Sequence, residues 1–151
     1  LEGRMTLILQ SKTFNPGKAL NKFQSEVKNC GAIISFTGVV RNNKQSDLKK
    51  LHIEHYPGMT EVAINELIAK AMQRWELSKS LVIHRYGDLY VNEIIMMVIT
   101  ASNHRIEAFQ AAEFLMDYLK SRAPFWKKEY TESGGNWVDS KEVDELALKR
   151  W

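Results

Sequence analysis

The sequence predicts one α+β domain with a mixed or antiparallel sheet and packed helices. Its 151 residues suit a single domain of ordinary size. Its hydrophobic (44%) and charged (26%) fractions are those of a typical globular protein. Strand-like and helix-like apolar spacings follow one another in the order β-α-β-β-α-β-β-α-β-β-α, which combines hairpins with crossover connections.

The first half of the chain is expected to hold three strands and two helices. Asn15 and Pro16 form a helix-start signal, because an asparagine side chain caps free amides and proline is favoured in the first turn. Gly31 is expected to end that helix in a left-handed conformation. The expected elements are strands over 6–10, 32–41 and 51–56 and helices over 16–29 and 59–74, the second with Thr60 and Glu61 at its start.

The second half repeats the pattern and ends on a helix. Pro124 must end the longest helix, because proline lacks an amide hydrogen. The expected elements are strands over 81–85, 93–102 and 125–130, turns at 87–88 and 133–136, a short strand at 137–138, and helices over 103–119 and 140–149. A pair between Glu145 and Lys149 is expected to support the last helix.

Composition and charge exclude several classes of protein. The net charge of +3 is a mild basic bias and not the dense basic stripe of a dedicated nucleic-acid binder. The single cysteine, Cys30, excludes an internal disulfide, and this low cysteine content suits a cytoplasmic protein. The Cys30 side chain is expected to be a small buried residue. No apolar run reaches the ~18 residues of a membrane span. Residues 1–4 precede Met5 and are expected to be a remnant of the expression vector, which leaves a domain over 5–151.

Motif searches give no common catalytic signature. The chain has no phosphate-binding glycine loop and no serine-hydrolase elbow. His52 and His55 are expected on opposite faces of a strand, which spoils them as a metal pair. His55 and His84 are expected to be strand residues satisfied by hydrogen bonds. No metal site and no bound cofactor are therefore expected.

Cationic residues cluster instead where predicted elements end. Arg41 follows a strand, and His104 and Arg105 open the longest helix, where free amides attract anions. Lys120 and Lys127 flank the break at Pro124, and their proximity would favour a neutral amine on one of them. Each residue alone suits a solvated surface. Together they predict an anion site, which Phe36, Phe125 and Trp126 would border with aromatic rings.

Four segments resemble one enzyme family, the large, catalytic subunit of molybdopterin synthase. They are FTGVVR (36–41), HYPGM (55–59), VIHRYG (82–87) and MDYLKSRAPFWKKE (116–129). The last segment, with two lysines around Pro-Phe-Trp, is the most specific. The resemblance runs from about Ile33 to Trp151 and implies a fold like the α/β hammerhead.

The resemblance also implies an activity and partners. Enzymes of this family convert cyclic pyranopterin monophosphate into the dithiolene molybdopterin. Their sulfur arrives as a thiocarboxylate on the C-terminal Gly-Gly of a small ubiquitin-like subunit, and the large subunit forms a homodimer within a heterotetramer. The resemblance implies neither a nucleic-acid nor a membrane partner. The lack of a cysteine nucleophile fits, because the partner brings the sulfur.

Site residues are carried over one by one from the resemblance. Lys120 matches a catalytic lysine, and Lys127 matches the lysine near the inserted tail of the small subunit. Three residues match substrate-binding positions: Arg41, His104 and Arg105. Phe36 and Met116 match pocket walls. Lys141 stands where relatives have an arginine, so it keeps the charge but loses the bidentate geometry.

The spacing of two of these residues predicts a shared site. Arg105 and Lys120 lie fifteen positions apart on one predicted helix, or about 22 Å at ~1.5 Å per residue. One substrate of roughly half that length would contact both only if they came from two copies of the chain. Two other functions stay open: a non-catalytic scaffold that docks a ubiquitin-like protein, and an RNA-binding module.

Overall fold

A computed structural model describes residues 4–139 and 141–151. Three of the four residues expected to be a vector remnant, and the predicted helix start at Ser140, therefore lie outside the described residues. The architecture is α+β, as predicted, with two four-stranded sheets and helices packed on them.

Sheet A has the strand order β1-β4-β6-β2. Its strands are β1 (Met5–Gln10), β4 (Lys79–Arg85), β6 (Ile94–Ser102) and β2 (Ala32–Val39). Only the β1–β4 pair is parallel within the sheet, and the other two pairs are antiparallel. The sheet is therefore mixed. Its parallel pair joins β1 and β4, and α1 and α2 lie between these strands in the chain, as the long connection of a parallel pair requires.

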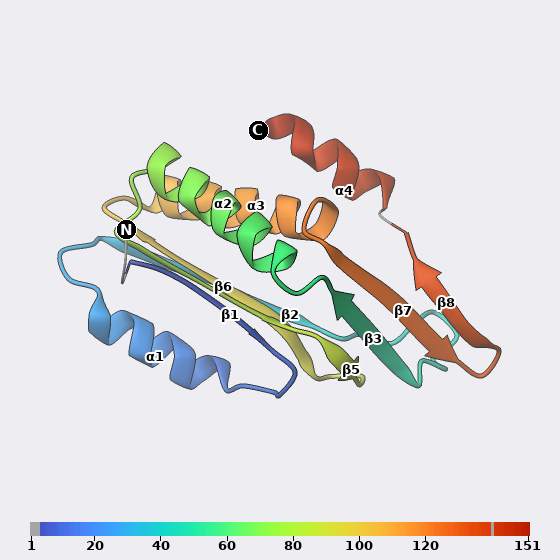
Figure 1. Cartoon of the computed structure of the whole chain (residues 1–151). Helices are drawn as coiled ribbons and strands as arrows, with labels where there is room; N and C mark the ends of the chain where they lie inside the picture. The colour runs from blue at the N-terminus through green and yellow to red at the C-terminus, as the bar shows by residue number, and fades with distance from the viewer. Residues whose placement is uncertain (1–3, 140) are drawn as a thin grey trace.

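Helices cover both faces of sheet A (Figure 1). Helix α1 (Pro16–Glu26) lies on one face, and α2 (Met59–Arg74) and α3 (Arg105–Ser121) lie on the other. Alternating strand residues serve the two cores: Leu81 and Ile83 pack with Phe23 of α1, whereas Val82 packs with α2 and α3. This alternation puts His84 on the α3 face.

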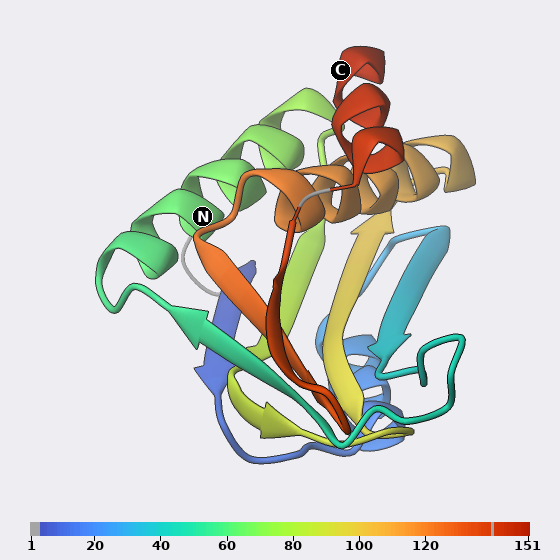
Figure 2. The same cartoon turned by 90° about the vertical axis from the view of Figure 1, so that its right-hand side faces the viewer.

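Sheet B is antiparallel and has the order β5-β3-β7-β8. Its strands are β3 (Lys50–His55), β5 (Gly87–Leu89), β7 (Phe125–Thr131) and β8 (Gly134–Val138). A small core of Val40, Leu51, Ile53 and Leu89 supports it. Figure 2 shows this sheet beside sheet A, with α4 (Glu142–Ala147) above β8 and a 3-10 turn (Leu148–Arg150) after it.

The predicted start of the first helix is confirmed, and its predicted end is not. Asn15 caps α1 as predicted, since its side-chain oxygen accepts a hydrogen bond from the Lys18 amide at 3.0 Å. The predicted glycine cap is wrong, because α1 ends at Glu26 and the left-handed residue is Asn29 (φ 57°). Gly31 is constrained for another reason: an added Cβ would lie 2.2 Å from the Asn103 carbonyl oxygen.

Three predictions in the second half are also wrong. Gly87 and Asp88 were expected to form a turn, but they belong to β5, since β3 supplies them with an antiparallel partner. The expected turn at 133–136 is shorter, because β8 already begins at Gly134. Glu145 forms an ion pair at 2.8 Å with Arg122, the C-cap residue of α3, and not the predicted pair with Lys149. In the first and third cases a segment far along the chain outcompetes the local signal.

Among residues 4–139 and 141–151, no helix has the length and apolar character needed to cross a bilayer.

Candidate active site

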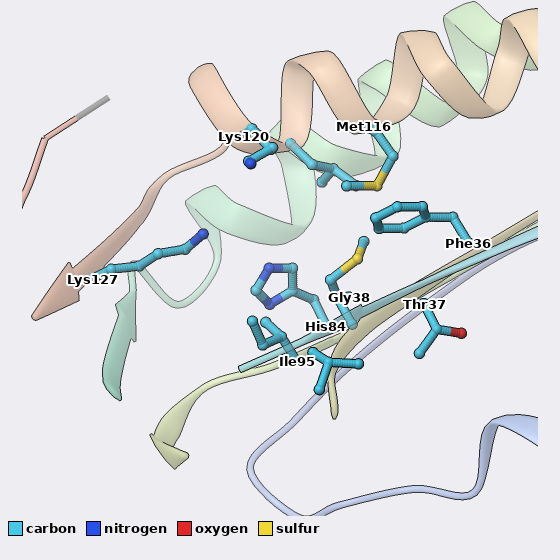
Figure 3. Close-up of a pocket in the computed structure, with 11 residues that line it drawn as sticks. Phe36, Thr37, Gly38, His84, Ile95, Met116, Lys120 and Lys127 are labelled. Atoms are coloured by element: carbon cyan, nitrogen blue, oxygen red, sulfur yellow. The ribbon is translucent and has the colours of Figure 1, made fainter. Parts of the chain in front are cut away.

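A cavity of about 330 Å³ opens where sheet A, the end of α3 and the start of β7 meet. Figure 3 shows side chains from these elements directed into it. Pro124 lies between α3, which packs on sheet A, and β7, which belongs to sheet B, so residues on either side of it lie near the cavity. The lining residues are Phe36, Thr37, Gly38, Val39, His84, Ile95, Met96, Met116, Leu119, Lys120 and Lys127.

One side of the cavity is apolar. Phe36 from β2 is 42% exposed, which is unusual for a phenylalanine, and it faces Met116 of α3 across the opening (Figure 3). Gly38 keeps the strand close to β6, because an added Cβ would lie 3.3 Å from the Met96 sulfur. The predicted roles of Phe36 and Met116 as walls agree with this placement.

The polar side of the cavity carries two lysines. Lys120 comes from the last turn of α3 and Lys127 from β7, so the two residues flanking Pro124 meet as the sequence predicts. Burial lowers the pKa of Lys127 from its ordinary value, and the positive charges of Lys120 and Lys141 lower it further. Asp144 opposes this effect. The amine of Lys127 therefore loses its proton more readily than an ordinary lysine does.

A second, smaller cavity of about 210 Å³ adjoins the first and shares Leu119, Lys120 and Lys127 with it. Lys141 and Asp144 line this second cavity. The Lys120 ammonium lies 3.8 Å from the Asp144 carboxylate. Within one copy, the structure thus places Lys141 on the same cavity as the two catalytic candidates.

The C-terminal segment holds this second cavity in place. The indole N–H of Trp151 donates to Asp117 at 2.6 Å, and its ring packs edge-on against Trp75 and Phe114. Together with the ion pair of Arg122 and Glu145, these contacts fix α4 on α3. They determine where Asp144 stands relative to Lys120.

Three predicted site residues lie elsewhere in the single chain. Arg41 is exposed, two residues beyond the lining residue Val39. His104 caps α3 and Arg105 begins it, and both are exposed. Because α3 runs without a break from Arg105 to Ser121, Arg105 and Lys120 lie at its opposite ends. One copy of the chain therefore does not bring all predicted site residues together.

His84 belongs to the cavity, although the sequence alone gave it no role. Its ring stacks on Phe125 with centroids 3.9 Å apart and planes 14° apart. Its Nδ1 lies 2.8 Å from the Arg85 carbonyl oxygen. Burial, with the nearby charge of Lys127 as a lesser cause, lowers the pKa of His84 to about 3. The sequence signal that could have indicated this position is the two-residue period of the strand, which puts His84 on the same face as Val82.

This buried imidazole predicts a specific loss of stability in acid. The pKa of His84 is about 3 in the folded chain and near 6.5 when unfolded. Between these values the unfolded chain binds more protons, so stability falls as the pH drops from about 6.5 towards 3. His84→Gln should flatten that dependence by up to a few kcal/mol, as measured by urea unfolding at pH 7 and pH 5. Equal pH slopes in both proteins would contradict the assignment.

Metal ligation finds no support in the part of the chain that the structure describes, because no three His, Cys, Asp or Glu side chains there are grouped to hold an ion. His52 instead pairs with Asp88 at 2.7 Å. The four tryptophans are dispersed, with Trp126 and Trp137 near Glu54 and Trp75 near Trp151. Trp126 was expected to border the anion site, but it does not line the cavity.

Comparisons with known proteins agree on one family. The family model described as MoaE protein matches residues 9–122. A relative from Cereibacter sphaeroides, named molybdopterin synthase catalytic subunit, is 54% identical over 147 residues, 97% of this chain and all of the relative. The structure of molybdopterin cofactor biosynthesis protein E from Burkholderia multivorans is 41% identical, with a TM-score of 0.81 over 97% of this chain and 96% of that one.

A more distant structure shares the fold. It is the protein–protein complex of subunits 1 and 2 of molybdopterin-converting factor from Helicobacter pylori, which is 20% identical with a TM-score of 0.72 over 93% of this chain and 92% of that one. The match of sequence and fold extends over the strands, α3 and β7 that build the cavity. The chain therefore belongs to the MoaE protein family.

Proposed function

We propose that this chain is the catalytic subunit of a molybdopterin synthase, which transfers sulfur from a thiocarboxylated carrier protein to cyclic pyranopterin monophosphate. The observation that carries the proposal is the cavity itself, which two lysines and apolar side chains including Phe36 and Met116 line together. Relatives about half identical in sequence bear the name of this enzyme. The activity is that of a sulfurtransferase.

The chemistry of sulfur transfer suits these two amines. A thiocarboxylate that gives up its sulfur ends as a carboxylate, so water must replace sulfur at the acyl carbon. The Lys120 ammonium is suited to polarise the acyl carbonyl, which stabilises negative charge on its oxygen. Lys127, with its lowered pKa, is suited to exchange protons with the substrate or the attacking water.

The sulfur donor is a second protein in this proposal. The structure from Helicobacter pylori is described as a complex of two subunits of molybdopterin-converting factor. We infer that a small ubiquitin-like carrier binds this chain in the same way and extends its C-terminal Gly-Gly thiocarboxylate towards Lys127. We infer a cytoplasmic location from this partnership and from the single cysteine of the sequence, which suits a reducing compartment.

The substrate's phosphate is assigned to cations from two copies of the chain. Lys120, Lys127 and Arg41 would serve one copy's cavity, and His104 and Arg105 would reach in from the other. Lys141 would join the cluster of its own copy, because it lines the second cavity with Lys120 and Lys127. The unbroken helix between Arg105 and Lys120 supports this division. Arginine and amide donors at a helix start are well suited to phosphate.

Reconstitution tests the function directly. The chain is incubated anaerobically with the thiocarboxylated carrier and cyclic pyranopterin monophosphate, and dithiolene formation is followed. Product should form with the carrier present, and the chain alone should form none. Carrier binding without product would favour the non-catalytic scaffold, whereas salt-dependent binding of single-stranded RNA would favour the RNA-binding module.

Replacing the only thiol provides a second check on the source of sulfur. Cys30 packs with the α1 side of sheet A, and the cavity opens on the α3 side. Cys30→Ser should therefore leave the rate of sulfur transfer from the carrier within about twofold of wild type, since remote substitutions seldom alter a site. Complete loss of turnover in a folded variant would show that the chain's own thiol takes part.

A further inference from the structure

One ring nitrogen of His84 has no use in the chemistry described so far. The Arg85 carbonyl oxygen only accepts hydrogen bonds, so the Nδ1 atom of His84, 2.8 Å away, must carry the proton and donate it. In a neutral imidazole the other nitrogen, Nε2, then carries a lone pair and no hydrogen. Among the described residues, none forms a hydrogen bond with that Nε2.

The ring is held firmly in this state. It is only 3% exposed and stacks on Phe125. Its hydrogen-bond partner is also fixed, because the Arg85 side chain donates to the Ser11 and Ile94 carbonyl oxygens and to Glu93. Rotation of the imidazole would break the bond to Arg85 and the stack. Nε2 is therefore a fixed acceptor on the cavity, and a ligand that covers it without offering a donor leaves it unpaired at a cost in free energy.

The place where this acceptor lies is the floor of the cavity. His84 is a lining residue together with Lys120 and Lys127, and Figure 3 shows the Lys127 side chain extending into the space beside the His84 ring. The other groups near the floor are apolar, including Ile95 and Met96. The cavity thus offers two cations for an anionic group and one neutral acceptor for a donor.

We propose that Nε2 of His84 accepts a hydrogen bond from an N–H or O–H group of the bound pyranopterin and so fixes the orientation of its flat ring. This inference rests on the proposed function. The lysines bind or polarise acyl and phosphate oxygens and select for charge, whereas His84 selects for a hydrogen donor on the ring. A single acceptor deep in an otherwise apolar wall discriminates strongly, because a ligand without the donor leaves it unpaired.

The chain itself offers a competing donor in Lys127. The ammonium of Lys127 lies on the same cavity and contributes to the lowered pKa of His84. Such a bond would occupy Nε2 before substrate arrives. The resonance of Nε2 in the free protein distinguishes the two arrangements, because a ring nitrogen that accepts a hydrogen bond resonates differently from a bare one.

The test measures this nitrogen in the wild-type protein. Uniformly 15N-labelled chain is titrated anaerobically with cyclic pyranopterin monophosphate. The Nε2 signal of His84 should start at the position of a bare acceptor and move upfield on saturation. An Nε2 signal that stays unchanged at saturation, or one already bonded in the free protein and restored to the bare position in Lys127→Met, would overturn the inference.

Three variants test the same bond by affinity. His84→Phe keeps an aromatic ring for the stack on Phe125 but removes the acceptor, and it should weaken pyranopterin binding about tenfold, the worth of one hydrogen bond. His84→Gln places an amide oxygen near the lost Nε2 and should recover part of that affinity. His52→Phe, on β3 outside the cavity, is the matched control and should bind like wild type.

Two outcomes separate this inference from the proposed function. If wild type forms dithiolene but His84→Phe, folded by circular dichroism, binds the pyranopterin with unchanged affinity, the role of His84 is wrong and the function stands. If the wild-type chain with its carrier neither binds nor converts the pyranopterin, the function and the inference fall together.

Discussion

Lys120→Ala and Lys127→Ala should each reduce single-turnover sulfur transfer by ~10²-fold or more, the range of lost acid–base or electrostatic catalysis. Both amines line the cavity, and burial with the charge of Lys120 lowers the pKa of Lys127. Lys49→Ala is the control, because Lys49 lies on the surface in an exposed pair with Glu132. A variant with full rate and only weaker substrate binding would show that this lysine binds the substrate by its charge and takes no part in the chemical step.

The pH profile shows which amine exchanges the proton. If neutral Lys127 is the active form, the rate rises with pH through the pKa of Lys127, which lies below the ordinary ~10.4 of lysine. Lys120→Met removes a positive neighbour, so the remaining activity should shift to higher pH. Asp144→Asn removes the carboxylate that raises this pKa, so its profile should shift to lower pH. Profiles that move together, or not at all, would assign the proton to another group.

A mixture of two inactive variants, Lys120→Ala and Arg105→Ala, should regain activity when the copies exchange. The two residues lie at opposite ends of the continuous helix α3, so each proposed site takes one from each copy. A hybrid dimer then holds one intact site and one doubly defective site. Random exchange of equal amounts should restore about a quarter of wild-type activity.

The control for complementation is a pair of variants on the same side of the division. Lys120→Ala mixed with Lys127→Ala should stay inactive, because both residues serve one copy's cavity and no hybrid holds an intact set. Activity should also depend on exchange, so mixtures assayed before the copies have exchanged should lack it. Persistent inactivity of the first mixture, after exchange has been shown by mass spectrometry, would place each site within a single chain.

The sequence by itself determined those parts of the fold in which local signals are complete. Helix α2 runs from Met59 to Arg74, the bounds that its apolar period predicts, and Asn15 caps α1 through its own side chain. Lys120 and Lys127 line the same cavity because Pro124 between them prevents α3 from continuing. In these places the neighbours that decide the conformation are close in sequence.

The tertiary structure alone decided what depends on partners far along the chain. Gly87 and Asp88 have turn chemistry, yet β3 makes them a strand, and Glu145 pairs with Arg122, 23 positions away. His84 became a fixed, neutral acceptor only because Phe125 stacks on it and the folded core removes water from it. Protonation and pairing depend on burial and on long-range contacts. Both arise only when the sheets and helices have packed, so local sequence patterns do not predict them.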